Sequence, residues 1–209
     1  MVFHDYKSIF VHIPKTAGTS IEYSVRNVKN KPSNYKFRHA PDHRTVLQYI
    51  KTKDQHKNHN NYVSIGDFWS YHKFAVVRDP VEREVSLYDF IKTRGRTMKG
   101  VSFDEYLDIM INDENFKQKG QTSSFKVSPK NMLRDQIDFI TSDGKILIDQ
   151  IIRFEGLQNG FNLYADKVGL KDKWLPHLRK SKRNRTKVTT DQIKLIKEIR
   201  KKDYELLSY

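Results

Sequence analysis

The chain has 209 residues, of which 39 are Lys or Arg and 25 are Asp or Glu, so its formal net charge is +14. It contains no cysteine, which excludes a disulfide framework and a zinc site with thiolate ligands. The opening residues lack the apolar stretch of a signal peptide, and no apolar run approaches the ~20 residues that a membrane span requires. We therefore expect one domain over residues 1–209 with a preference for anionic partners.

The first informative stretch is a short apolar run at residues 9–13, which is typical of a buried strand and which Pro14 ends. A helical pattern begins near residue 19, and the positive end of such a helix can hold an anion in the turn before it. In that turn Gly18 would let the backbone approach a phosphate, and Lys15 adds a positive charge. The alternative is an ordinary turn between a core strand and a surface helix. The turn consists of Lys15, Thr16, Ala17, Gly18, Thr19 and Ser20.

This turn differs from the Walker A motif, G-x-x-x-x-G-K-[ST], in which the lysine closes the loop and the next hydroxyl binds magnesium. Here Lys15 opens the loop, and no glycine precedes it. A P-loop kinase or nucleotide hydrolase is therefore the weaker alternative, and it predicts a dependence on magnesium.

A second stretch has the same organisation. Residues 74–77 are typical of another buried strand, which Arg78 follows directly. Asp79 is expected to cap the next helix, and Glu82 to complete a capping box. Ser86 then falls on the second or third turn of that helix. An arginine fork and a hydroxyl placed in this way could bind a second phosphate.

Strands and helical segments alternate along the rest of the chain, which predicts an α/β domain with a parallel sheet. Ligands of such sheets bind at the carboxyl ends of the strands, where both candidate phosphate motifs lie. The polar segment 112–130 is either a substrate lid or a disordered insert, and residues 51–61 are expected to form a loop. Strands are expected at 7–13, 35–38, 62–65, 73–77, 136–140, 145–148 and 151–154, and helices at 19–27, 45–50, 81–93, 103–111, 157–168 and after Thr190, which is expected to cap the last one.

Together, PKTAGTS at 14–20 and RDPVEREVSLY at 78–88 resemble the sulfotransferase superfamily, most closely the carbohydrate, heparan and uronyl 2-O-sulfotransferases. The resemblance extends through 153–155 and 175–181. It implies a P-loop-like, three-layer α/β fold with a central, mainly parallel sheet flanked by helices. It also implies transfer of a sulfuryl group from 3′-phosphoadenosine 5′-phosphosulfate (PAPS) to a hydroxyl, with a carbohydrate as the expected acceptor, adenosine 3′,5′-bisphosphate (PAP) as product and no metal requirement.

In that family the first motif binds the 5′-phosphosulfate, and the second, R-x-P-x-x-R-x-x-S-x-Y, binds the 3′-phosphate. The resemblance therefore assigns the 5′ end of the donor to residues 15–20, with Lys15 stabilising the leaving phosphate, and the 3′-phosphate to Arg78 and Ser86. A late basic loop of the family also helps to bind the 3′-phosphate, which extends the assignment to Ser181 and Arg183.

The acceptor hydroxyl requires a base, and histidine is the usual residue because its pKa lies near neutral pH. Relatives often carry His-x-Thr leading into a helix, and His43-Arg44-Thr45 matches that pattern. We expect His43 to be the base, with His39 as the next candidate. The alternative is that His43 only contributes to a helix N-terminus. For His12, in the first strand, a core or edge position is expected.

Two further expectations concern the setting of the protein. Many relatives that act on carbohydrates are anchored in the Golgi by a transmembrane helix, so its absence predicts a soluble, cytoplasmic enzyme of a microbe or virus, or a trimmed Golgi enzyme. A nucleic-acid-binding module is an alternative function, since the charge of +14 is combined with interleaved Tyr and Phe. That alternative leaves both phosphate motifs unexplained.

Overall fold

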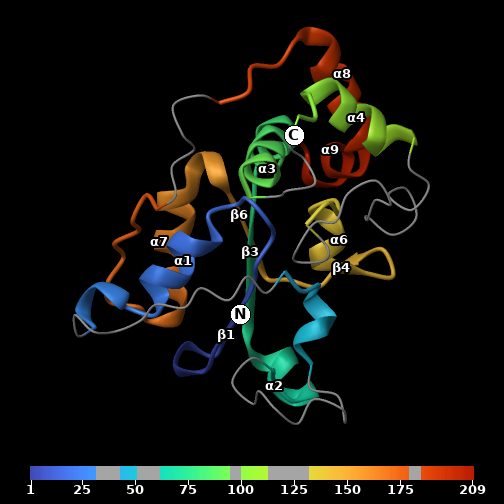
Figure 1. Ribbon diagram of the computed structural model, residues 1–209. Helices are drawn as coiled ribbons and strands as arrows, with labels where there is room; N and C mark the ends of the chain where they lie inside the picture. The colour runs from blue at the N-terminus through green and yellow to red at the C-terminus, as the bar shows by residue number, and fades with distance from the viewer. Residues whose placement is uncertain (32–42, 51–61, 95–99, 113–131, 179–184) are drawn as a thin grey trace. The chain divides into compact units, whose positions relative to one another are not determined.

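The computed structural model describes residues 1–31, 43–50, 62–94, 100–112, 132–178 and 185–209 (Figure 1). The chain divides into two compact units. The first comprises Met1–Val77 and Phe139–Arg179, and the second comprises Arg78–Asp138 and Lys180–Tyr209. The predicted strand at 35–38, the loop at 51–61 and all but the first residue of the polar segment 112–130 lie outside the described residues.

The first unit is built on a four-stranded sheet in the order β1-β2-β3-β6. β2, β3 and β6 are parallel to one another, and β1 is an antiparallel edge strand beside β2. The prediction of a central, mainly parallel sheet is therefore confirmed, whereas the short edge strand was not predicted. The strands are β1 (Val2–Phe3), β2 (Ser8–Val11), β3 (His72–Val77) and β6 (Gln150–Arg153).

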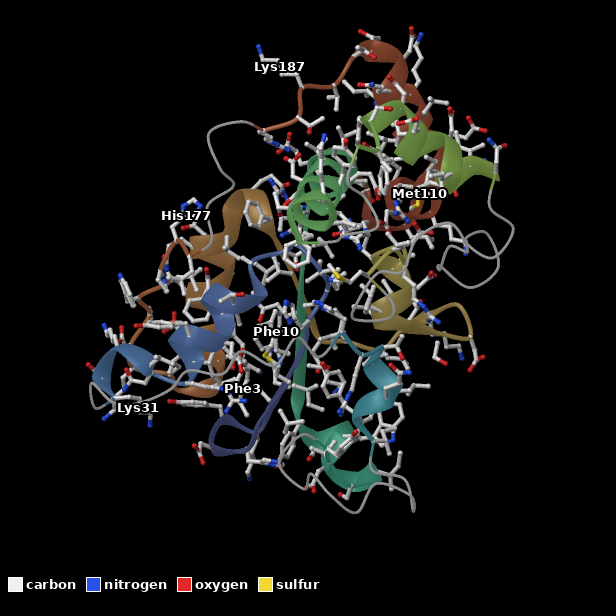
Figure 2. All side chains as sticks on the ribbon, viewed as in Figure 1. Phe3, Phe10, Lys31, Met110, His177 and Lys187 are labelled. Atoms are coloured by element: carbon white, nitrogen blue, oxygen red, sulfur yellow. The ribbon has the colours of Figure 1, made fainter. Side chains whose placement is uncertain are left out.

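Two helices, α1 (Gly18–Val25) and α7 (Leu157–Val168), pack on this sheet (Figure 1). Their apolar faces meet alternate strand residues such as Phe10 and Phe74 in one buried cluster, to which Phe3 also belongs (Phe3 and Phe10 are labelled in Figure 2). Each such side chain contributes about 1.5–3 kcal/mol of burial free energy. The short elements of this unit are η1 (His4–Tyr6), η2 (Val28–Asn30), η3 (Val46–Tyr49), α2 (Ile65–Ser70), β4 (Thr141–Ser142), β5 (Lys145–Ile146) and η6 (Phe154–Gly156).

The predicted strand at 62–65 is wrong except for one bridge, in which Val63 pairs with Ile50. Helix α2 begins at Ile65 instead, because Ser64 caps it and its Oγ accepts a hydrogen bond of 3.0 Å from the Asp67 amide. Local side-chain capping therefore competes successfully with the strand preference of the apolar residues.

The second unit is helical and contains α3 (Pro80–Arg94), α4 (Phe103–Asn112), α8 (Thr190–Ile199) and α9 (Lys201–Leu207). The predicted Asp79 cap of α3 is confirmed, since Asp79 Oδ1 accepts from the Glu82 amide at 2.9 Å. Helix α4 is capped in the same way by Ser102, whose Oγ accepts from the Glu105 amide at 3.2 Å. The N-cap of α8 is Thr189, one residue before the predicted cap. The core of this unit is a cluster of apolar residues that includes Tyr88, Phe103, Tyr106, Leu107, Met110 and Ile196.

The predicted strand at 136–140 is also wrong, because these residues begin helix α6 (Ile137–Ile140). Asp203, which is distant in sequence, accepts hydrogen bonds from the amides of Gln136 and Ile137 at 3.0 and 2.9 Å. The carboxylate thus satisfies N–H groups at the helix start, a role that the local sequence does not reveal.

The single C-terminal helix that we expected is divided into two helices, α8 and α9, and a buried ionic network lies at the division. Arg200 separates α8 from α9, and its guanidinium lies 2.7 Å from Glu84 Oε2 and 3.0 Å from Asp135 Oδ1. Tyr106 donates to the other oxygen of Glu84. The side chains of Arg200 and Glu84 are each only 1% exposed, so their charges are balanced by each other and by neighbouring polar groups in the core rather than by water. None of the helices in the described parts of the chain combines the length and the apolar character needed to cross a membrane.

Candidate active site

The first candidate motif is the turn between β2 and α1 in the first unit. Lys15 and Ala17 both have left-handed backbone conformations, with φ values of 69° and 65°. Such residues in a tight turn aim successive N–H groups into one concavity, which is the geometry of an anion-binding nest. Because neither residue is glycine, each conformation costs about 1–3 kcal/mol, and strain of this kind concentrates at functional sites.

The rest of the turn fixes this conformation. Thr16 is buried, and its Oγ1 donates a hydrogen bond of 2.9 Å to the Ile13 carbonyl. The Ala17 carbonyl accepts from the amides of Ser20 and Ile21 at 2.9 and 3.1 Å, which starts helix α1. The turn therefore opens at the positive end of a helix that follows a parallel strand.

Gly18 has a packing role that differs from the one expected. A Cβ at this position would lie 1.8 Å from Nε2 of His12, so the missing side chain makes room for the imidazole of that residue. His12 lies just after β2 and is 4% exposed. Of the two positions expected for His12, core or edge, the structure shows the core position, and the ring lies directly against the start of α1.

His43 contacts the same histidine. Its Nδ1 lies 3.0 Å from the His12 carbonyl oxygen, and the two rings are 4.5 Å apart between centroids. Because a carbonyl can only accept, Nδ1 carries the hydrogen, and in the neutral ring Nε2 then carries the lone pair. The short helix η3 that follows His43 is capped by Thr45 together with Gln48.

The second candidate motif lies in the second unit. The Gln136 side chain holds the backbone of Arg78 from both sides, accepting from its amide at 2.9 Å and donating to its carbonyl at 2.8 Å. The guanidinium of Arg78 lies 3.2 Å from Glu82 Oε2. Ser86 is buried one helical turn beyond Glu82, so the side chains of Glu82 and Ser86 share a face of α3.

Glu82 also binds Arg185, whose Nη1 lies 2.7 Å from the same carboxylate oxygen. Burial acts to raise the pKa of the Glu82 carboxyl, but Arg185 and Arg78 outweigh this effect and hold the pKa below its usual value of 4.5. The carboxylate is therefore ionised at neutral pH.

The candidate residues thus form two groups, one in each unit. Sequence patterns did not indicate the roles of Gln136 and Arg185, because both contact Arg78 or α3 from far along the chain. For His12 the sequence indicated a core or edge position. Phe154 packs on the core of the first unit, and His177 is exposed. His39, Ser181 and Arg183 lie outside the described residues.

Comparison with known proteins identifies the family of the chain. No curated protein and no solved structure matches it. The family model described as the sulfotransferase family matches residues 1–209. Since this match spans the whole length, the chain belongs to the sulfotransferase family.

Proposed function

We propose that this sulfotransferase uses PAPS as donor, that residues 1–209 act as one catalytic domain, and that the acceptor hydroxyl belongs to a carbohydrate. The observation that carries the proposal is the turn before α1, in which two non-glycine residues, Lys15 and Ala17, have positive φ values directly before a helix start, a conformation suited to an anion nest. The choice of a carbohydrate rests on the resemblance of both motifs to the carbohydrate, heparan and uronyl 2-O-sulfotransferases.

The residues present fit the two ends of this donor. In the proposal the P-loop-like turn, residues 15–20, holds the 5′-phosphosulfate, with backbone N–H groups and the Lys15 ammonium as donors. Arg78 and Ser86 hold the 3′-phosphate, and Ser181 and Arg183 join them. The fit at the 3′ end is supported by Glu82, since Arg78 already binds an anionic oxygen there.

When bound, PAPS supplies an electrophilic sulfur attached to a phosphate leaving group. His43, held by the His12 carbonyl, would take the proton of the attacking hydroxyl at Nε2. The Lys15 ammonium and the amides of the turn would stabilise the negative charge that develops on the leaving phosphate oxygen. Stabilisation of this kind accelerates the reaction because it is strongest in the transition state.

Replacing Lys15 with alanine is the sharpest test of this assignment. We expect turnover to fall by about 10²–10³, because one donor to the developing charge is lost, while the affinity for PAP changes only a few-fold. The measurement is transfer of radiolabelled sulfate from PAPS to a panel of sugars, phenols and tyrosyl peptides.

The matched control is Lys167→Ala, which removes an exposed lysine from α7 of the same unit and should leave transfer unchanged. Failure of the unmodified protein to transfer sulfate to any acceptor would contradict the proposed function. Full turnover with weakened PAP binding in Lys15→Ala would instead reduce Lys15 to a binding residue.

A further inference from the structure

One carboxylate oxygen in the second unit forms ion pairs with two arginines. Glu82 Oε2 lies 3.2 Å from Nη2 of Arg78 and 2.7 Å from Nη1 of Arg185. Arg185 also donates to the backbone carbonyl of Glu82 at 3.4 Å. Both guanidiniums are therefore directed to the first turn of α3, one turn before Ser86.

The three side chains differ in how freely they can move. Arg78 is only 12% exposed, whereas Glu82 is 45% exposed and Arg185 is 35% exposed. The backbone of Glu82 is fixed, since its amide donates to Asp79. A rotation of the Glu82 side chain into water would thus need no movement of the α3 backbone, and hydration would offset much of the lost ion pairing.

We infer that Glu82 is an internal competitor for the phosphate site, occupying Arg78 and Arg185 when no 3′-phosphate is bound and weakening the affinity for that phosphate. The inference rests on the proposed function, in which Arg78 binds the 3′-phosphate. A phosphate carries two negative charges and three acceptor oxygens, so it outcompetes one carboxylate for two guanidiniums. The competition lowers the net affinity because the ion pairs to Glu82 must be exchanged, and the displaced carboxylate repels the phosphate.

This competition has a consequence for turnover. The 3′-phosphate is present both before and after transfer, so every contact to it binds donor and product alike and cannot by itself accelerate the chemical step. A carboxylate that returns to the arginines assists departure of the product. Glu82 is thus assigned the role of keeping PAP from being held too tightly.

The test is a calorimetric titration of the full chain and its Glu82→Gln variant with PAP and with adenosine 5′-phosphate. Glutamine keeps the size and one acceptor oxygen but removes the charge. We expect PAP to bind the variant on the order of tenfold more tightly. This factor corresponds to the free energy of one charge-assisted contact, which no longer has to be broken before the 3′-phosphate binds. Adenosine 5′-phosphate should bind within about twofold of the unmodified protein, because it lacks the 3′-phosphate.

Two further variants make the result specific. Glu205→Gln removes an exposed carboxylate of the same unit, 59% exposed and paired across the surface with Lys201, and should not change PAP affinity. In an Arg78→Ala background the Glu82→Gln change should tighten PAP binding by clearly less than tenfold, since one of the two ion pairs that it disrupts is already absent and only the pair with Arg185 remains.

Equal or weaker PAP binding by Glu82→Gln would overturn the inference and make Glu82 an orienting partner of Arg78. Equal tightening of both nucleotides would overturn it as well, because the effect would then be a general one of net charge. If the unmodified protein binds neither nucleotide, the proposed function and the inference fall together. If it binds PAP and only the variant prediction fails, the proposed function stands.

Discussion

Replacing His43 with alanine is expected to lower the turnover of sulfuryl transfer by about 10²–10⁴ while PAP affinity stays nearly unchanged. The reason is the hydrogen bond of 3.0 Å between its Nδ1 and the His12 carbonyl, which leaves Nε2 as the basic nitrogen of the neutral ring. For the unmodified protein, turnover should rise with pH as this imidazole loses its proton. Steady-state rates across pH, with PAP titrations on the same samples, provide the measurement.

His43→Asn separates a base from a structural residue. An asparagine amide can donate to the His12 carbonyl in place of Nδ1, but it offers no basic nitrogen. We expect His43→Asn to fold and bind PAP normally and yet to be as slow as His43→Ala. Activity restored by asparagine would show that only the hydrogen bond matters. His39→Ala is the matched control, and a folded but inactive His39→Ala beside an active His43→Ala would move the role to His39.

The second large effect concerns stability. Replacing Arg200 with methionine should destabilise the second unit by about 3–5 kcal/mol, because it leaves the carboxylate of Glu84 buried without its guanidinium. Urea denaturation followed by far-ultraviolet circular dichroism gives the free energy of unfolding. Lys201→Met is the control: its side chain is 73% exposed and its partner Glu205 lies 3.6 Å away, so the change should be under about 0.5 kcal/mol.

We also expect the loss of stability in Arg200→Met to depend on pH, with a sign that follows from the pKa of Glu84. Burial acts to raise the pKa of Glu84, but Arg200, together with smaller effects of Arg83 and Tyr106, outweighs burial and holds the pKa below the usual 4.5. A lowered pKa adds stability above the unfolded value, and this contribution is lost as the pH falls through the folded value. Without Arg200 the carboxyl takes up a proton on folding, which is easier at low pH. The stability difference between the two proteins should therefore be largest near neutral pH and shrink below the usual pKa, and a difference independent of pH would contradict this explanation.

The parts of the molecule that local sequence predicts correctly are those that local interactions determine. Strand β2 depends on an apolar run, and Pro14 separates this run from the start of α1. The cap of α3 depends on the Asp79 side chain, which lies directly before the helix. For the same reason the sequence alone predicts that both candidate phosphate motifs follow strand ends.

The errors arise where a distant residue decides the outcome. Residues 136–140 alternate polar and apolar side chains as a strand does, but Asp203 accepts from the amides at the start of this segment, which is helical. Gln136 in turn fixes the backbone of Arg78. Likewise, Gly18 is required by the ring of His12, which no spacing rule indicates. Such contacts become visible only when the chain is folded, because their residues have no fixed separation in sequence.

The most direct test of the proposed donor is calorimetric titration of the full chain with PAP in the presence of a metal chelator. We predict one-to-one binding that needs no metal and exceeds the affinity for adenosine 5′-phosphate by about tenfold to a hundredfold, the effect of charge-assisted contacts to the 3′-phosphate. Arg78→Ala should remove most of this preference. No binding of PAP, or binding of nucleotides only with magnesium and without preference for the 3′-phosphate, would contradict the assignment of PAPS as donor.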